Sequence, residues 1–384
     1  MVAHNAYRQR GGEDAVVDSE ITLLRSHGHE VIEYRRHNDE VQDVGKVHLA
    51  GETLWSRRTV AEVEKLLGVH RPQLIHVHNT LPLISPSIYW AAASAGLPVV
   101  QTLHNFRLIC PQAMLLRQGR VCEKCVGAST LPAVVHGCYR NSRAQSAVLA
   151  GMLSVHRALG TWSQKIDRYI ALNEFCRDKF IQGGLPAERI AVKPNFVHEP
   201  PARQQNQPRS GLLFVGRLAP EKGIELLAQA AANMAEGVLR IAGAGPSDVA
   251  IRSLRSVQML GELERGRVTS EMASAIALVM PSLCYENFPL ALVEAFSCGL
   301  PVLASRLGAL ATLVEDGVTG LLFEAGSSSD LEAKMQWALA HPERMAEMGL
   351  AARKAYEELY SPEVNYRQLS AVYRSVISSR AGDR

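Results

Sequence analysis

The segment PSLCYENFPLALVEAFSCGLPVLAS, residues 281–305, decides the fold of the second half of this chain. It follows an apolar run, residues 276–280, that is typical of a buried strand and ends at Pro281. A short polar loop comes next, and residues 290–297 then supply helix formers up to Gly299. Residues 302–304 are again apolar. The order therefore predicts a strand, a loop, a helix and a second strand.

The predicted loop is suited to hold an anion beside hydroxyl groups. Backbone N–H groups at the start of a helix favour a negative group such as a diphosphate. Glu286 lies in the loop, and Glu294 follows eight residues later, inside the helix. Carboxylates repel phosphates, but they accept hydrogen bonds from sugar hydroxyls. Two glutamates often flank a helix by chance, but the preceding strand, Pro289 and the Gly-Leu-Pro turn favour a binding site here.

Residues 286–294 resemble the E-x7-E motif of retaining GT-B glycosyltransferases of family 4. This resemblance implies an α/β fold with two Rossmann-like, doubly wound domains that face a cleft. It also implies a hexosyltransferase that takes a sugar from a nucleotide-diphosphate sugar and retains its configuration. Glu286 would then hold the sugar, and Glu294 would bind the ribose hydroxyls. The backbone contacts to the donor would come from Asn287, Phe288, Pro289 and Leu290.

A second motif, GRLAPEKG, contains two basic residues and occupies residues 216–223. It follows a predicted strand at residues 212–215. Arg217 and Lys222 are five residues apart, so both could reach one diphosphate and stabilise a departing nucleotide. Isolated basic residues in loops are usually only solvated. The motif, however, resembles the diphosphate-binding signature of the same family. The resemblance also assigns three glycines and one leucine to the donor site: Gly216, Gly243, Gly245 and Leu263.

In the first half, strands and helices alternate from residue 2 to residue 103, which predicts a parallel sheet. Ligands bind at the carboxyl ends of such strands. His78 falls at one of these ends, and we interpret it as structural, as most lone histidines are. His104 resembles the family's histidine that contacts the transferred sugar, so we predict a catalytic role. Gly11 and Gly12 form either a plain tight turn or, by resemblance, a loop that faces the donor phosphates and the acceptor.

Residues 106–141 interrupt the alternation with four cysteines in the pattern C-x11-C-x2-C-x12-C. A reducing cytosol disfavours disulfides, and four thiolates can hold zinc tetrahedrally. The predicted ligands of a structural zinc ion are Cys110, Cys122, Cys125 and Cys138. Free thiols or a redox pair are the alternatives. The chain contains no D-x-D triplet, so we expect no metal or other cofactor in catalysis.

The net charge of +3 gives no reason to expect nucleic-acid binding. Residues 105–166 are more basic, with eight Lys or Arg against one acid, Glu123. Within them, residues 147–162 have a helical pattern that suits an anionic membrane surface, although a core-facing helix with solvated charges is the alternative. The start of the chain lacks the apolar segment of a signal peptide. We therefore expect a cytoplasmic protein that contacts the inner face of the membrane.

The patterns predict four parts. They are an acceptor-binding domain at 1–197 that includes the cysteine insert, a linker at 198–210, a nucleotide-sugar-binding domain at 211–362, and a C-terminal helix at 363–384 that crosses back to the first domain. The resemblance implies transfer to a saccharide or lipid-linked acceptor in surface polysaccharide or glycolipid synthesis. The alternatives are a UDP-sugar epimerase, for which the additional acids and histidines are missing, and a non-catalytic binding subunit, against which the intact motifs speak.

Overall fold

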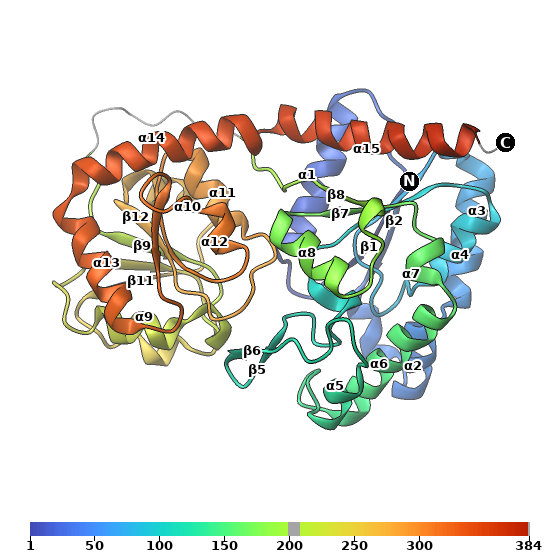
Figure 1. Cartoon of the computed structure of the whole chain (residues 1–384), viewed down its shortest axis with the longest axis horizontal. Coiled ribbons are helices and arrows are strands. Elements are labelled where there is room, and N and C mark those ends of the chain that lie inside the picture. Colours follow the sequence, from blue (N-terminus) through green and yellow to red (C-terminus); the bar gives the residue numbers. More distant parts are fainter. Residues whose placement is uncertain (199–207, 383–384) are drawn as a thin grey trace. The chain divides into compact units, whose positions relative to one another are not determined.

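The computed structural model describes residues 1–198 and 208–382, and it divides into two compact units (Figure 1). Unit 1 comprises Met1–Leu115, Glu123–Asn195 and Asn365–Arg384. Unit 2 comprises Leu116–Cys122 and Phe196–Val364. Most of the predicted linker, residues 199–207, lies outside the described residues.

Unit 1 is built on a parallel sheet of six strands in the order β2-β1-β3-β4-β7-β8. The strands are β1 (Val2–Ala6), β2 (Glu33–His37), β3 (Ile75–Val77), β4 (Val99–Thr102), β7 (Arg168–Ala171) and β8 (Ile190–Val192). The helices are α1 (Gly12–Ser26), α2 (Lys46–Leu54), α3 (Arg57–His70), α4 (Ser87–Ser94), α5 (Leu131–Val135), α6 (Arg143–Ala158), α7 (Thr161–Gln164) and α8 (Glu174–Gln182), with short 3-10 turns η1 (Asn38–Asp43), η2 (Phe106–Leu108) and η3 (Ala187–Arg189). The order of the strands reverses between β1 and β3, because β2 lies on one side of β1 and β3 lies on the other. We call this position the reversal point of unit 1.

Unit 2 repeats this plan with six parallel strands in the order β11-β10-β9-β12-β13-β14. The strands are β9 (Leu212–Val215), β10 (Leu239–Ala242), β11 (Val257–Gly261), β12 (Ala277–Met280), β13 (Val302–Ser305) and β14 (Gly320–Phe323). The helices are α9 (Ile224–Ala231), α10 (Arg265–Ser274), α11 (Leu290–Ser297), α12 (Leu310–Leu313), α13 (Ser328–Ala340) and α14 (Pro342–Leu359), with η4 (Pro220–Lys222) and η5 (Asp248–Ala250). The reversal here falls between β9 and β12. The two sheets confirm the prediction of two doubly wound α/β domains.

The predicted helix at residues 147–162 is wrong at both ends. Helix α6 begins at Arg143, because the Ser142 hydroxyl accepts a hydrogen bond from the backbone N–H of Gln145 and so caps it. It ends before Gly160, whose φ of 68° breaks the helical path before α7 begins. The insert at 106–141 also contains an unpredicted antiparallel hairpin, β5 (Leu116–Arg117) and β6 (Arg120–Val121).

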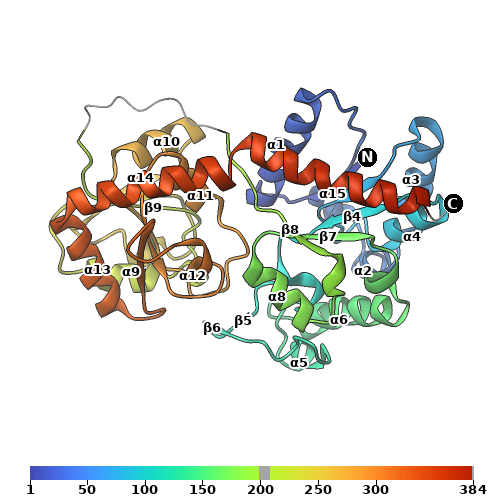
Figure 2. The same cartoon turned by 45° about the horizontal axis from the view of Figure 1, so that its top comes forward.

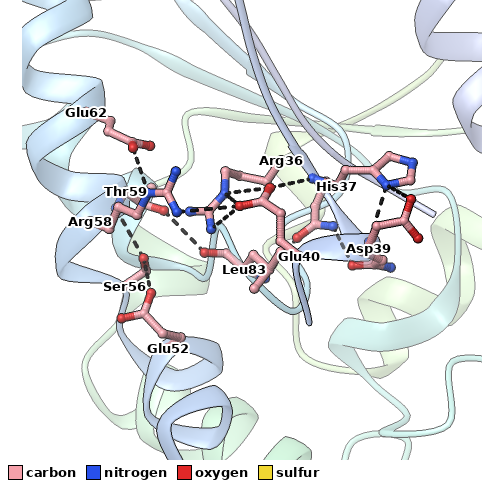
Figure 3. Close-up of polar contacts among 12 residues, drawn as sticks. Arg36, His37, Asp39, Glu40, Glu52, Ser56, Arg58, Thr59, Glu62 and Leu83 are labelled. Carbon is pink, nitrogen blue, oxygen red and sulfur yellow. Dashed lines mark hydrogen bonds and ion pairs between the residues drawn. The ribbon is translucent and has the colours of Figure 1, made fainter. Parts of the chain in front are cut away.

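A network of ion pairs fixes the carboxyl end of β2 against α3 (Figure 3). The guanidinium of Arg36, which is 7% exposed, lies 2.8 Å from Glu40 in η1. Glu40 also accepts a hydrogen bond from the backbone N–H of His37 at 2.9 Å. Arg58, in the first turn of α3, contacts both Glu40 and Glu62. Because one member is buried and several charges share the contacts, the network holds this edge of the sheet more firmly than isolated surface pairs would.

The last helix, α15 (Pro362–Gly382), belongs to unit 1 from Asn365 onward and packs along the sheet of that unit (Figure 2). Its buried side chains Leu369 and Val376 join a core cluster with Leu24, Leu74, Val100 and Ile170. Polar contacts reinforce this packing, since Asn365 donates a hydrogen bond to the carbonyl of Pro194 and Arg380 pairs with Asp167. Among the residues described, no helix combines the length and apolarity that crossing a bilayer requires.

We predict that Leu369→Ala lowers the free energy of unfolding by about 2–4 kcal/mol, because Leu369 is fully buried and its loss leaves a cavity under α15. Urea unfolding of the full chain measures the change. Leu350→Ala is the control, because Leu350 is 75% exposed and its truncation should cost less than about 0.5 kcal/mol. Equal effects of the two variants would show that α15 does not stabilise unit 1.

Candidate active site

The reversal point of unit 2 brings the two motifs of the second half of the chain together. β9 and β12 are neighbours in the sheet, and the loop 216–223 and the loop 281–289 leave their carboxyl ends. Gly223 has a φ of 74°, and a Cβ there would collide with the carbonyl oxygen of Pro281. The two loops therefore pack backbone against backbone. A reversal of strand order is the position at which open α/β sheets bind ligands.

Lys222 and Glu286, both predicted to be catalytic, form an ion pair across these loops. The ammonium nitrogen lies 2.6 Å from Oε1 of Glu286, and the Ser282 hydroxyl donates to the same oxygen at 2.6 Å. Burial alone would raise the pKa of Glu286, but the charge of Lys222 and these hydrogen bonds lower it. The pKa of Lys222 is raised because Glu286 outweighs the effect of burial. Glu286 is thus held as a carboxylate.

The remaining predicted positions lie just beyond the carboxyl ends of β9, β10 and β11. Arg217 is 63% exposed and contacts Glu221 in the next turn. Gly216 follows β9 and Gly243 follows β10, and a Cβ on Gly243 would collide with the carbonyl oxygen of Gly216. Gly245 lies just beyond, and Leu263 lies partly exposed after β11. The residues predicted to bind the diphosphate and the nucleotide therefore follow three adjacent strands of the sheet.

The helix after the second loop, α11, begins where the sequence predicts. Asn287 precedes the helix, Pro289 is its N-cap, and Leu290 is its first residue. The ring of Phe288 is buried and packs edge-on against Tyr360 at 5.9 Å between centroids. Phe288 therefore leaves its backbone, and not its ring, for a ligand. Burial raises the pKa of Glu294, on the second turn of α11, and the charge of Arg265 partly offsets this effect.

A second group of polar residues, at the start of α1, lies at the reversal point of unit 1. Its glycines were predicted from the sequence, and its acid Glu13 was not. Gly11 is the N-cap of α1, and its N–H donates to Asp14 at 2.8 Å, which is consistent with a tight turn at Gly11 and Gly12. Glu13 accepts a hydrogen bond from the Tyr7 hydroxyl at 2.9 Å. Burial raises the pKa of Glu13. An acid directly after a glycine pair was the sequence signal that could have identified it.

His104 is joined to a buried chain of polar side chains. Its Nε2 lies 2.8 Å from Nδ1 of His78, and Nε2 of His78 lies 3.5 Å from Oε2 of Glu20. The other oxygen of Glu20 lies 2.5 Å from the ammonium of Lys193. Neither Glu20 nor Lys193 was predicted as a site residue from the sequence. The signal for Glu20 was its place on the apolar face of α1, four residues before Leu24.

One group of described side chains is arranged closely enough to hold a metal ion: Glu20, His76 and His78. The ammonium of Lys193 already lies beside the carboxylate of Glu20, and its positive charge would repel a metal dication at this position. His76 is also occupied, because its nitrogens lie 2.7 Å from the hydroxyls of Tyr373 and Thr102. We therefore assign no metal there. The four insert cysteines form no such group in the described residues, and their zinc site stays a prediction.

Comparison with known proteins identifies the family. A model of group 1 glycosyl transferases matches residues 199–355, and a model of glycosyltransferase family 4 matches residues 10–199. Glycosyltransferase models thus match both halves of this chain, from residue 10 to residue 355. A D-inositol 3-phosphate glycosyltransferase of Catenulispora acidiphila is 27% identical over 80% of this chain and 73% of its own length. A phosphatidyl-myo-inositol mannosyltransferase of Mycobacterium leprae is 30% identical over 58% of this chain and 62% of its own length.

A solved structure shows the same fold. The structure of HepE of Anabaena in complex with UDP aligns with a TM-score of 0.66 and 18% identity, over 97% of this glycosyltransferase and 99% of that chain. The likeness confirms the predicted GT-B fold class. This chain spans about half the length of several other curated relatives that it matches.

We predict that Lys222→Met destabilises the protein at pH 7, because it leaves Glu286 buried without its partner. The cost should be below the about 3–5 kcal/mol typical of a broken buried pair, since the Lys222 side chain is 28% exposed. Urea unfolding measures it. The same substitution at Lys354, whose pair with Glu358 is exposed, is the control and should have almost no effect.

The pH dependence tests the same pair. Because the pKa of Glu286 is lowered in the folded state, the pair contributes fully above the ordinary carboxyl pKa of 4.5 and loses its contribution as the pH falls through the lowered pKa. The difference in unfolding free energy between wild type and Lys222→Met should therefore shrink in acid. A difference that stays constant from pH 7 to pH 3 would contradict the ion pair.

Proposed function

We propose that this chain transfers a sugar from a nucleotide-diphosphate sugar to a saccharide or lipid-linked acceptor, with retention of configuration, in surface polysaccharide or glycolipid synthesis. The observation that carries the proposal is the meeting of Lys222, Glu286 and the start of α11 at the reversal point of unit 2. A cation and a helix N-terminus suit a diphosphate, and a fixed carboxylate suits sugar hydroxyls. The UDP named in the HepE structure supports a nucleotide donor.

Each predicted side chain takes one role in this proposal. Arg217 and Lys222 neutralise the charge that develops on the leaving diphosphate, which is where fixed positive groups lower the barrier most. Glu294 accepts hydrogen bonds from the ribose hydroxyls, and Leu263 lies beside the nucleobase. The backbone of residues 287–290 and Glu286 hold the sugar. No metal is needed for the diphosphate in this scheme, because the two cations and the helix supply the charge.

The surroundings of Glu286 favour a positioning role and not nucleophilic attack. Its Oε1 already accepts hydrogen bonds from Lys222 and Ser282, and a carboxylate with a lowered pKa is a weaker nucleophile. We therefore propose that the acceptor attacks from the face that the phosphate leaves, and that the departing phosphate takes its proton. This route retains the configuration without a covalent sugar intermediate. An epimerase is not favoured, because the curated relatives named above are glycosyltransferases.

We predict that Lys222→Ala lowers sugar transfer on the order of 10²–10³-fold, as the loss of one charge-stabilising group does in other enzymes. A panel of UDP-, GDP-, ADP- and dTDP-sugars is first screened by thermal shift to find the donor, because a ligand that binds the folded state raises the melting temperature. Turnover is then measured with that donor. Lys354→Ala is the charge-matched control. Full turnover in Lys222→Ala, or no shift with any nucleotide sugar, would contradict the proposal.

We also propose that unit 1 contacts an anionic membrane through α5 and α6, which pack against each other. Large apolar side chains are exposed there: Leu131, Val135, Val155 and Leu159. Exposed basic residues accompany them: Arg140, Arg143 and Arg157. Apolar side chains beside basic ones are the composition that binds anionic lipid surfaces. Such a contact would bring the chain to a lipid-linked acceptor.

We predict that the double substitution Arg143→Ala and Arg157→Ala weakens binding to phosphatidylglycerol vesicles on the order of 10-fold or more, because each basic residue near such a surface contributes about 1 kcal/mol. Co-sedimentation at low salt measures the binding. Arg367→Ala with Arg374→Ala is the matched control, since both lie exposed on α15. Equal losses in the two double variants would show that the binding depends on total charge and not on this surface.

A further inference from the structure

The chain Glu20–His78–His104 connects a buried carboxylate to a histidine at the carboxyl end of β4. Glu20 and His78 are 2% and 4% exposed, and His104 is partly exposed. The two imidazoles stack with their centroids 5.1 Å apart and share the 2.8 Å contact between Nδ1 of His78 and Nε2 of His104. One proton lies in that contact. Its position decides which hydrogen-bonding group His104 offers at its other nitrogen.

The carboxylate of Glu20 decides the position of that proton. If Nδ1 of His78 carried it, Nε2 of His78 would present a lone pair to Oε2 of Glu20 at 3.5 Å, and two acceptors would face each other in a buried space. With the proton on Nε2 of His78, the positive end of the N–H bond lies near the carboxylate, at 3.5 Å between the heavy atoms and without a hydrogen bond, and the electrostatic repulsion becomes attraction. Nδ1 of His78 is then an acceptor, and Nε2 of His104 must be the donor.

Lys193 places a buried positive charge beside the carboxylate of Glu20. Its ammonium lies 2.5 Å from Oε1 of Glu20 and 3.2 Å from Oδ1 of Asn365. Both partners are buried, and removing either one would leave the other as an uncompensated buried charge. Among the described residues, neither Oε2 of Glu20 nor Nε2 of His78 makes a hydrogen bond, so electrostatic attraction across their 3.5 Å contact is what links them.

His104 itself is neutral in this setting. The titratable groups around it are His4, Asp14, Glu20, His76, His78 and Lys193. Burial lowers the pKa of His104 well below its ordinary value, the neighbouring histidines and Lys193 lower it further, and Asp14 opposes them. In the described residues, Nδ1 of His104 makes no hydrogen bond.

We propose that Glu20 and His78 are positioning residues that hold His104 as the neutral tautomer protonated on Nε2, so that its Nδ1 accepts a hydrogen bond from a ligand hydroxyl. A neutral acceptor selects a hydroxyl donor and disfavours a phosphate oxygen, which also only accepts. The ligand group at the end of β4 is therefore a sugar hydroxyl and not the diphosphate. This last step rests on the proposed function, whereas the tautomer rests on the contacts of unit 1 alone.

The tautomer is tested without any substrate. The full chain is labelled with ¹⁵N-histidine, and the ring nitrogens are observed by NMR at pH 7.5, with His104 assigned from its absence in His104→Gln. We expect a protonated Nε2 and an unprotonated Nδ1 on His104. A proton on Nδ1, or on both nitrogens, would overturn the proposal.

A matched pair at position 78 tests the relay. Asn and Leu have nearly the same shape, but only the Asn oxygen can accept the hydrogen bond from Nε2 of His104. His78→Asn should keep the His104 tautomer, whereas His78→Leu should give a mixture of both tautomers. The same ring spectrum in both variants would overturn the role of His78. Circular dichroism and the melting temperature of each variant establish that it is folded.

Activity separates this inference from the proposed function. With UDP-glucose as the probe, the release of UDP should fall about 5- to 10-fold in His78→Leu relative to His78→Asn, the loss expected for one neutral hydrogen bond. Equal rates in the two variants would overturn the sugar contact at His104. If the wild type turned over no nucleotide sugar, the proposed function and the sugar contact would fail, and the tautomer measured by NMR would stand.

Discussion

The ion pair between Lys222 and Glu286 is the contact on which the candidate site of unit 2 depends. The two residues are 64 positions apart in the sequence, and they meet because β9 and β12 are neighbours at the reversal point of the sheet. Gly223 lets the two loops approach closely enough for the pair to form. A cation next to a carboxylate is an unusual way to prepare a phosphate site, because the carboxylate opposes the phosphate. Such a pair suits a ligand that carries both phosphates, which the lysine attracts, and hydroxyls, which donate hydrogen bonds to the carboxylate.

Unit 1 uses the same architecture for different chemistry. Its reversal point carries a buried chain of polar groups that begins at the ion pair of Lys193 with Glu20 and ends at His104. Burial is what distinguishes the two sites. In unit 2 the carboxylate is balanced by a lysine that solvent can partly reach, so the lysine can exchange partners. In unit 1 the lysine is fully buried, so its pairing with Glu20 is fixed and the adjacent histidines inherit a fixed tautomer.

Much of the architecture could be predicted from the sequence, because it depends on local patterns. The apolar runs and the glycines and prolines that end them predicted β9 and α11 at their observed bounds. The spacing of Arg217, Lys222, Glu286 and Glu294 depends on one loop and one helix each, so the motifs could be read from neighbouring residues. The hairpin at 116–121 and the start of α6 were missed, since they depend on short capping and turn contacts.

The sequence by itself determined two doubly wound sheets and the residue types at their strand ends. Only the tertiary structure decided which of those residues meet. Glu20 and Lys193 are 173 positions apart, and no local pattern predicts that α1 and the end of β8 place their charges 2.5 Å apart. His78 has the sequence signature of a structural histidine, and it takes on a functional meaning only beside His104. The reason is physical: periodicity and capping are local, whereas the order of strands in a sheet sets which distant side chains share one buried space.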